Sequence, residues 1–326
     1  MRIATFNIDS LDMSPDAAVP LESRIPILTP QLERLRADIL CLQEVNGQRQ
    51  VGGRPRTLKA LDRLLEGTHY QTYTRAVSTG RSGAGVADVH NLVTLSRWPI
   101  LSFQSIRHSL VPPLFYRPLT AIPASTDPFE VGFERPLLLA NIEIAGGRTL
   151  TVINAHFRAP IAAPIPGQKE SAFVWKSVGG WAEGYTVSAW QRMAQALEAR
   201  LVIERLMDED PPRFIIVAGD FNAEDHETPL RILIGADDDT GNGSLAMRAL
   251  TALDRSLPGD RRFSVVHHGR AQMPDHILSN WSTLAYFRNI EIHNENLADE
   301  LVSFGRVRQE PGSPHAPLVA EFNMGD

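Results

Sequence analysis

The chain has 326 residues, of which 43% are hydrophobic, 21% charged and 7% aromatic. This composition is ordinary for a globular protein and excludes a disordered chain. With 32 basic and 38 acidic residues, the formal net charge is −6, so the strongly basic surface of an avid, nonspecific nucleic-acid binder is missing. An enzyme that meets phosphate through a bound cation does not need such a surface.

Cys41 is the only cysteine, which excludes an intramolecular disulfide. It lies in the apolar run 39–42, where a buried small hydrophobe is expected rather than a reactive thiol. The N-terminus leads straight into a predicted strand without an apolar signal segment, and no apolar run approaches the length of a transmembrane span. We therefore predict a cytoplasmic protein with no transmembrane segment, and the sequence leaves its oligomeric state open.

The first predicted elements are a strand over about 2–8, a helix that begins at Thr29-Pro30, and a buried strand over about 38–44. A second helix is expected near Thr57–Leu65, and a long one over about 186–207. On the long helix, an apolar stripe is formed by Trp190, Met193, Leu197 and Leu201.

Further strands are predicted over about 70–75, 89–96, 136–144, 149–156, 213–219, 263–267, 275–279, 285–292 and 317–322. The paired glycines Gly146-Gly147 suit a tight turn and predict a hairpin. Many strands with hairpins and few helices favour an α+β layered sandwich. With no repeat or linker in the sequence, we predict a single domain over 1–326.

Two long segments rich in Pro and Gly interrupt this pattern, near 108–134 and 157–185. Loops of this length in a compact domain are usually functional or mobile. The second segment contains Lys169, Lys176 and two tryptophans, and it directly follows His156. Two interpretations stay open for it: a lid or substrate wall, and a surface excursion with its own small apolar cluster.

Polar side chains stand at the ends of several otherwise apolar strands. Asn7 and Asp9 close the first strand, and residues two apart on a strand face the same side. Glu44 ends a buried run, where a carboxylate is costly unless it is paired or bound to a cation. The remaining strand-end groups are His156, Asp220, Asn222, Asp275 and His315.

Each of these residues also has an ordinary structural interpretation. Asn7 could cap a turn, Glu44 could be an exposed strand-end charge, and Asp220 with Asn222 could form an Asx-turn. Their joint occurrence at strand ends favours a functional site. Carboxylate and amide oxygens prefer Mg²⁺, Mn²⁺ or Ca²⁺ over zinc, and His267-His268 is a poor zinc pair because adjacent strand residues face opposite ways.

Six short motifs appear in order along the chain: Phe6-Asn7-Ile8-Asp9, Leu42-Gln43-Glu44, Ile153-Asn154-Ala155-His156, Gly219-Asp220-Phe221-Asn222, Asp275-His276-Ile277-Leu278 and Ser313-Pro314-His315-Ala316-Pro317. Together they resemble the endonuclease/exonuclease/phosphatase superfamily, from residue 3 to about residue 322. Gly-Asp-Phe-Asn is a fairly strong motif alone, and the ordered set is highly specific. The resemblance implies a four-layered α/β sandwich with two packed mixed β-sheets, flanked by helices, and an active site at one end.

The resemblance also implies a role for each matching residue. Glu44 is the principal ligand of Mg²⁺ or Mn²⁺, supported by Asn7 and, through water, by Asp9. Asp220 positions or deprotonates the attacking water, Asn222 holds a phosphate oxygen, and His156 donates to the phosphate or assists the leaving group. Asp275 orients His315, which is either the general base or a donor to the transition-state phosphate.

One position departs from the family pattern, which has Ser-Asp-His where this chain has Ser313-Pro314-His315. The missing aspartate casts doubt on a second metal site and on tight metal binding, and Asp299 or Glu300 is a candidate substitute. Outside the motifs, Arg117, Arg135 and Asn91 are candidate substrate contacts, because a planar guanidinium suits phosphate recognition.

The sequence thus predicts a divalent-metal-dependent phosphodiester hydrolase whose substrate is a nucleic acid, a lipid headgroup diester or a small diester. The acidic net charge does not favour nucleic acid. Two alternatives remain: a phosphomonoesterase for a sugar, inositol or nucleotide phosphate, and an inactive protein that binds a phosphate ligand.

Overall fold

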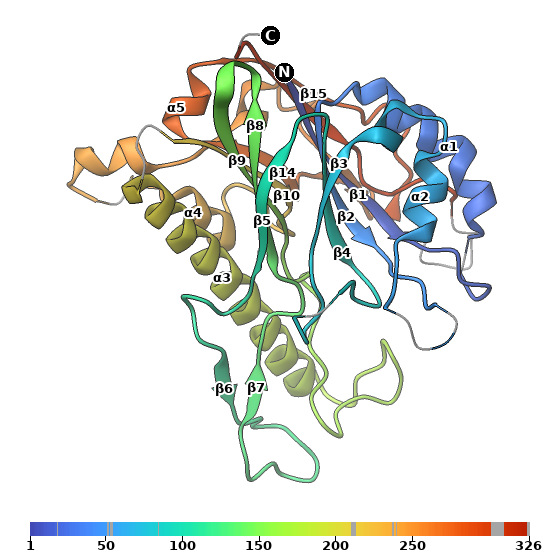
Figure 1. The fold of residues 1–326 in the computed structure, drawn as a ribbon. Helices are drawn as coiled ribbons and strands as arrows, with labels where there is room; N and C mark the ends of the chain where they lie inside the picture. Colours follow the sequence, from blue (N-terminus) through green and yellow to red (C-terminus); the bar gives the residue numbers. More distant parts are fainter. Residues whose placement is uncertain are drawn as a thin grey trace.

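The computed structural model describes residues 1–324 except 18, 51, 53–54, 84, 210–212, 237, 239 and 301–309. Two six-stranded mixed sheets pack face to face, and helices cover their outer faces, which gives four layers (Figure 1). The first sheet contains, in order, β15 (Phe287–Ile292), β16 (Leu318–Phe322), β1 (Arg2–Leu11), β2 (Ile39–Val45), β4 (Asn91–Ser96) and β3 (Thr74–Val77). The second contains β11 (Thr251–Ala252), β14 (Asp275–Ser279), β10 (Phe214–Asp220), β9 (Arg148–His156), β8 (Leu137–Ile144) and β5 (Ile100–Ile106). The predicted fold class is confirmed.

Helices α1 (Leu21–Leu35) and α2 (Lys59–Leu65) cover the first sheet, and α3 (Val178–Glu209) and α4 (Thr228–Ile234) cover the second. A short helix, α5 (Trp281–Leu284), follows β14. Within the described ranges, no helix is both long and apolar enough to cross a bilayer.

The alternation of side chains along each central strand separates two kinds of core. On β1, Ala4, Phe6 and Ile8 pack against the helices, whereas Ile3 belongs to the cluster between the sheets. On β10, Ile215 and Val217 face α3, and Ile216 and Ala218 face the other sheet. Side chains alternate between the two faces of a strand. Polar residues that lie an even number of positions after Ile3 on β1, or after Ala218 on β10, therefore point into the space between the sheets. This parity places the candidate site at the sheet ends.

The first helix begins earlier than predicted. It starts at Leu21 and continues through Pro26 and Pro30, so Thr29 is not its N-cap, and the Thr29 hydroxyl bonds to Leu64 O instead. A buried stripe, Leu21, Arg24, Leu28, Leu32 and Leu35, holds the whole helix against the sheet. Tertiary packing therefore outweighs the local cost of two prolines.

Other boundaries also differ from the prediction. Residues His69–Thr72 form a 3₁₀ turn before β3, and the strand predicted over 263–267 is β12 (Val265–His267), paired with β13 (Arg270–Gln272) outside the main sheets. The edge strand β5 was not predicted, because most of its residues are exposed and lack alternation. The hairpin at Gly146-Gly147 is confirmed by the antiparallel pairing of β8 with β9.

The segments near 108–134 and 157–185 are more ordered than a loop. The first contains the two-stranded ribbon β6 (Leu114–Tyr116) and β7 (Phe129–Val131), and the second ends inside α3. The predicted apolar stripe of α3 does not face the core, which is contacted by Ala196, Ala199 and Ile203. Trp190, Met193 and Leu197 instead line a groove of about 670 Å³ between α3 and the first segment.

Candidate active site

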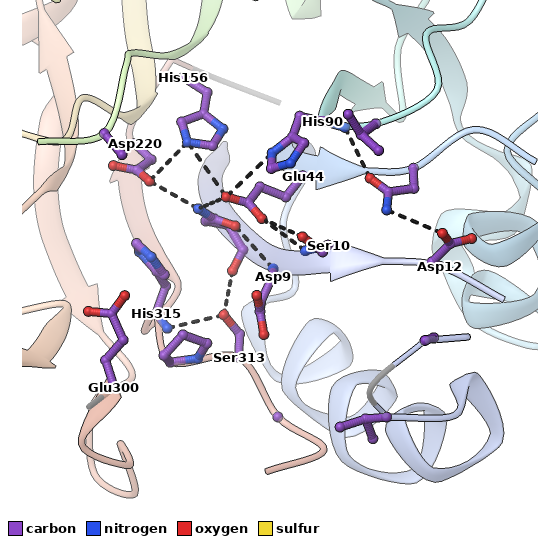
Figure 2. Close-up of a pocket in the computed structure, with 18 of the residues that line it drawn as sticks. Asp9, Ser10, Asp12, Glu44, His90, His156, Asp220, Glu300, Ser313 and His315 are labelled. Carbon is purple, nitrogen blue, oxygen red and sulfur yellow. Dashed lines mark hydrogen bonds and ion pairs between the residues drawn. The ribbon is translucent and has the colours of Figure 1, made fainter. Parts of the chain in front are cut away.

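A cavity of about 860 Å³ opens where β1, β2, β9 and β10 end (Figure 2). Among the described residues, its lining includes eight carboxylates, from Asp9, Asp12, Asp16, Glu44, Glu134, Asp220, Glu300 and Glu310. It also includes three arginines and three histidines: Arg24, Arg135, Arg158, His90, His156 and His315. Such an excess of negative charge repels an anionic substrate unless a cation offsets it.

Glu44 reaches the cavity through a break in its strand. Leu40 and Leu42 face the helices, so regular alternation would send Glu44 outward as well. The pairing of β2 with β4 shifts register between Leu42 and Val45, and Glu44 has a φ of 62°. This left-handed conformation re-aims its carboxylate into the cavity, and such strained residues cluster at functional sites.

Asn7 links the two central carboxylates. Its Nδ2 donates to Glu44 Oε1 at 3.3 Å and to Asp220 Oδ2 at 3.0 Å, while its Oδ1 accepts from the Asp9 backbone N–H at 3.0 Å. The amide thus offers hydrogens to the carboxylates, and its oxygen is used by the backbone. In this arrangement Asn7 orients Glu44 and Asp220 and does not present an oxygen as a metal ligand.

His156 and Asp220 are neighbours in register on β9 and β10, and their side chains approach each other. His156 Nε2 lies 3.4 Å from Asp220 Oδ2 and 3.7 Å from Glu44 Oε1. Burial lowers the pKa of His156 well below its usual value, and the charges of Arg135, His90 and His315 lower it further. His156 is therefore a neutral imidazole whose Nε2–H faces two acceptors.

Gly219 allows this close pairing of strands. A Cβ at this position would lie 1.9 Å from Ala155 O, and the φ of Gly219 is 153°. Two residues later, Asn222 has a φ of 49°; its N–H donates to Asp220 Oδ1 at 2.9 Å, and its Nδ2 donates to Phe157 O at 3.1 Å. In the Gly-Asp-Phe-Asn motif, the glycine is thus needed for the close backbone contact, and the polar side chains are needed for the hydrogen bonds.

Asp275 and His315 form a buried pair opposite Glu44. Asp275 Oδ2 lies 2.7 Å from His315 Nδ1 and also accepts from Ser264 Oγ at 2.7 Å. Ser313 Oγ accepts from the His315 N–H at 3.1 Å and donates to Asn7 O at 2.6 Å, which ties the last motif to the first. Ligand atoms of Asp220, Asp275 and His315 all lie within 4.8 Å of one another.

The protonation of Asp220 and His315 follows from this geometry. Burial, together with the charge of Asp275, raises the pKa of Asp220 to about 7. Burial lowers the pKa of His315, but the Asp275 carboxylate, with Asp220 and Glu44, outweighs it and raises the value to about 10. The arrangement therefore favours the imidazolium form of His315 and lets Asp220 keep its proton to a higher pH than a free carboxyl.

A divalent cation fits beside Glu44. Glu44 Oε1 lies 3.7 Å from both His90 Nδ1 and His156 Nε2, and the buried His90 Nδ1 has no hydrogen-bond partner. Burial raises the pKa of Glu44, but the positive charges of His90, Arg135 and His315 and a bond from Ser10 lower it overall, so the carboxylate is ionised. Burial lowers the pKa of both His90 and His156, and an ionised carboxylate beside two such imidazoles is a donor set that a metal ion can use.

Several predicted residues do not lie in the cavity. Asn91 is fully engaged with Val45 O and with the Ala87 backbone, so its role is structural. Arg117 is exposed on the first long segment, and neither it nor Lys169 or Lys176 lines the cavity. Arg135 does line it, as predicted, and donates to Phe157 O at 3.0 Å.

The two candidates for the missing aspartate also have other partners. Asp299 accepts from the backbone N–H groups of His268 and Gly269, and Glu300, which lines the cavity, lies 2.7 Å from His267 Nδ1. Neither belongs to a group of described residues arranged to hold an ion. The second group of described residues that could hold an ion is instead Asp220, Asp275 and His315.

Sequence reasoning missed three contributors. His90 was passed over for its neighbour Asn91, although a positive φ of 57° turns it toward Glu44. Gln43 and Asn154 stand inside two of the motifs, and a bond of 2.8 Å between their side chains joins the two sheets below the cavity. The available signal was a polar residue inside a buried strand, one position before Glu44 for Gln43 and two before His156 for Asn154.

Comparison with known proteins accounts for this arrangement. The family model described as Endonuclease/Exonuclease/phosphatase family matches residues 4–294. The chain belongs to this family. Its members are hydrolytic, divalent-metal-dependent nucleases and phosphatases, so the chain is a phosphoric ester hydrolase. No curated protein matches it by sequence.

Solved structures share the fold over the full length of the chain. A humanized D. rerio TDP2 is 14% identical with a TM-score of 0.55, over 99% of both chains. An AP endonuclease from Archaeoglobus fulgidus is 17% identical with a TM-score of 0.52, over 99% of this chain and 100% of that one. The 3′ phosphatase NExo from Neisseria, bound to product DNA hairpin, is 16% identical with a TM-score of 0.52, over 99% of both chains. At these identities the likeness concerns the fold.

Proposed function

We propose that this protein hydrolyses phosphodiesters by attack of water on phosphorus. The observation that carries the choice of a diester is the state of the three arginines in the cavity. Arg24 donates to the backbone carbonyls of Ile8, Asp9 and Pro311, and Arg158 is paired with Glu134 at 2.6 Å.

Arg135 is likewise held by Phe157 O and lies 3.9 Å from Glu134. Each arginine of the lining thus already has hydrogen-bond or ion-pair partners within the protein. A diester has one negative charge, which His315 and a single metal ion can offset. A terminal monoester phosphate carries more charge and would compete with those partners for the arginines, so phosphomonoester hydrolysis is the weaker candidate.

Within this proposal, Asp220 takes the proton of the attacking water, and His315 remains protonated and stabilises the charge that develops on the phosphate oxygens. The pKa of about 7 for Asp220 and of about 10 for His315 support this division of roles. Asp275 orients the ring of His315 through its bond to Nδ1. His156 can donate to the phosphate or to the leaving oxygen through Nε2.

Asn222 uses one amide hydrogen on Phe157 O and can give the other to a phosphate oxygen. Glu44 would hold the metal ion, with His90 beside it and with Asp9 contributing through water. The ion, which we propose to be Mg²⁺ or Mn²⁺, supplies charge neutralisation and polarisation of the phosphate. Because two imidazoles adjoin Glu44, Zn²⁺ belongs in the test.

The substrate class follows from the charge of the cavity mouth. Asp12, Asp16, Glu134 and Glu310 line it, and a nucleic acid would bring several phosphates against these carboxylates. TDP2 of D. rerio has been crystallised with a single strand DNA product, whereas the lining of this cavity has eight carboxylates and only three arginines among the described residues. A small or headgroup diester is therefore favoured over nucleic acid.

The test offers aryl phosphodiesters, aryl phosphomonoesters and plasmid DNA to the purified protein with Mg²⁺, Mn²⁺, Zn²⁺ or EDTA. We expect diester turnover that needs a metal and falls by about 10³-fold in Asp220→Ala and in His315→Ala. The exposed residues Asp260 and His268 provide matched controls, and Asp260→Ala and His268→Ala should retain full activity. Turnover that persists in Asp220→Ala, or a clear preference for monoesters, would overturn the proposal.

A further inference from the structure

The two long segments, 108–134 and 157–185, fold together, and we refer to them jointly as the insertion unit. Ile122 N–H donates to Pro166 O at 3.0 Å, and Glu183 accepts from the Thr120 N–H at 2.9 Å and from Tyr116 Oη at 2.6 Å. A small apolar cluster lies between the unit and α3, formed by Ala121, Val131 and Ile165 of the unit and Val187 of the helix, with flanking aromatic rings. The second segment thus has an apolar cluster of its own, and its first residues, Arg158 and Ile161, also line the cavity.

The insertion unit is also fixed to the rest of the molecule. Glu198, which is buried on α3, accepts from the N–H groups of Ser109 at 2.7 Å and Val111 at 2.6 Å. Gln191 donates to Gly132 O at 2.9 Å. Since side chains of α3 clamp both ends of the first segment, the unit is a shaped projection, and its surface residues hold defined positions.

Large apolar side chains are concentrated on the outside of this unit. Of the nineteen exposed large hydrophobic residues in the described part of the chain, ten lie within 114–122 and 161–185. They are Leu114, Phe115, Leu119, Ile122, Ile161, Phe173, Val174, Val178, Trp181 and Tyr185. Phe115 is 64% exposed, Leu119 78% and Val178 81%. An exposed apolar patch of this extent marks an interaction surface.

The patch lies beside the active-site opening. Figure 1 shows β6, β7 and the chain that precedes α3 projecting together from one end of the molecule, at the bottom of the view. Ile161 is 56% exposed and also lines the cavity, so the apolar surface continues to the cavity rim. Whatever covers the patch therefore meets the mouth of the site.

We propose that the insertion unit docks the protein on a lipid surface. The segments that carry these apolar side chains project from one end of the molecule, and only Leu114 among them lines the groove beside α3. A fluid apolar phase accepts such a projecting shape without a complementary partner surface. Trp181 and Tyr185 stack with ring centroids 5.4 Å apart and are partly exposed, as amphipathic rings are at the level of lipid headgroups.

The charge of the unit excludes an electrostatic attachment. Its residues include four basic side chains, Arg117, Arg158, Lys169 and Lys176, and five acidic ones, Asp127, Glu130, Glu134, Glu170 and Glu183. This near balance does not favour nucleic acid, whose binding depends on net positive charge and weakens steeply with salt. Docking through apolar contacts on zwitterionic lipid should persist at high salt.

The experiment measures co-sedimentation of the full chain with phosphatidylcholine vesicles at low and high salt. Two double variants each remove one part of the patch: Phe115→Ser with Leu119→Ser, and Phe173→Ser with Val174→Ser. The matched control, Leu101→Ser with Phe103→Ser, removes two equally exposed apolar side chains from β5. Thermal unfolding of every variant verifies that it is folded.

We expect the wild type to bind vesicles at both salt concentrations and each patch variant to partition at least ~10-fold more weakly, because burying one large apolar side chain is worth at least a factor of ten. The β5 control and His315→Ala should bind like the wild type, so the result does not depend on the proposed hydrolysis. Failure of the wild type to sediment, or equal binding by the patch variants, would overturn the proposal. A dimer that the patch variants abolish, without vesicle binding, would assign the patch to a second copy of the chain and would overturn it as well.

Discussion

The pair Asp275–His315 allows the roles at the active site to be tested through a single charge. Asp275 Oδ2 lies 2.7 Å from His315 Nδ1, and the side chains are only 2% and 13% exposed. Burial lowers the pKa of His315, but the charge and hydrogen bond of Asp275, with Asp220 and Glu44, raise it from 6.5 to about 10. At about 1.36 kcal/mol per pKa unit, this elevation corresponds to roughly 5 kcal/mol in favour of the imidazolium.

Asp275→Asn keeps the shape of the side chain and removes its charge. The pKa of His315 should then fall by about 1–3 units, since burial is opposed only by the more distant carboxylates. If protonated His315 is required, the alkaline limb of the pH profile of kcat/KM for an aryl diester moves to lower pH by the same amount. An NMR titration of the His315 ring protons provides the independent measurement.

Ser264→Ala is the matched control, because it removes one hydrogen bond to Asp275 and leaves the carboxylate in place. It should move the alkaline limb only slightly. If Asp275→Asn lowers the pKa of His315 in the NMR titration while the alkaline limb stays where it is, protonated His315 is not required for turnover and the assignment of its role is refuted.

Three further predictions concern stability and metal binding. Burial raises the pKa of Asp220 from 3.8 to about 7, so between these pH values the folded protein holds a proton that the unfolded chain releases, and its stability falls as the pH rises. In urea unfolding at pH 8 with EDTA, Asp220→Asn should therefore be more stable than the wild type by roughly 1–2 kcal/mol. An unchanged unfolding midpoint would contradict the burial argument. Glu44→Gln should weaken Mn²⁺ binding at least ~10-fold in calorimetry, and an unaltered affinity would remove Glu44 as the ligand. Arg24→Met breaks bonds to three backbone carbonyls and should lower the free energy of unfolding by about 2–3 kcal/mol, whereas Arg34→Met, which loses an exposed pair with Glu295, should cost less than about 1 kcal/mol.

Most strands of the two sheets could be predicted because a buried strand needs a run of apolar residues, and such runs can be read directly from the sequence. The prediction failed where burial is one-sided or comes from distant packing. The strand β5 carries exposed Leu101 and Phe103 and resembles a loop in sequence, while α1 contains two prolines that only its buried stripe can tolerate. The stripe on α3 was real, but it faces a groove, since hydrophobic periodicity does not say which surface a helix face will meet.

The candidate site was predictable in its members at strand ends and not in its geometry. Asn7 and Asp220 occupy strand positions whose side chains face the space between the sheets, and the alternation of side chains along a strand is enough to predict this. Glu44 has the opposite parity and enters the cavity through a left-handed residue, and His90, just before β4, also has a positive φ. Positive φ angles at residues other than glycine follow from tertiary contacts, so no local pattern indicated them.

The sequence by itself indicated most of the polar residues that meet at the candidate site, because carboxylates, amides and imidazoles at the ends of buried strands are too costly to place there without a partner. Only the tertiary structure decided how they are protonated and which of them meet. Asp220 and His315 have displaced pKa values because segments far apart in the chain bring Asp275 between them and exclude water. Local sequence fixes the identity of a titrating group, whereas its charge depends on the distances and burial that the packed sheets create.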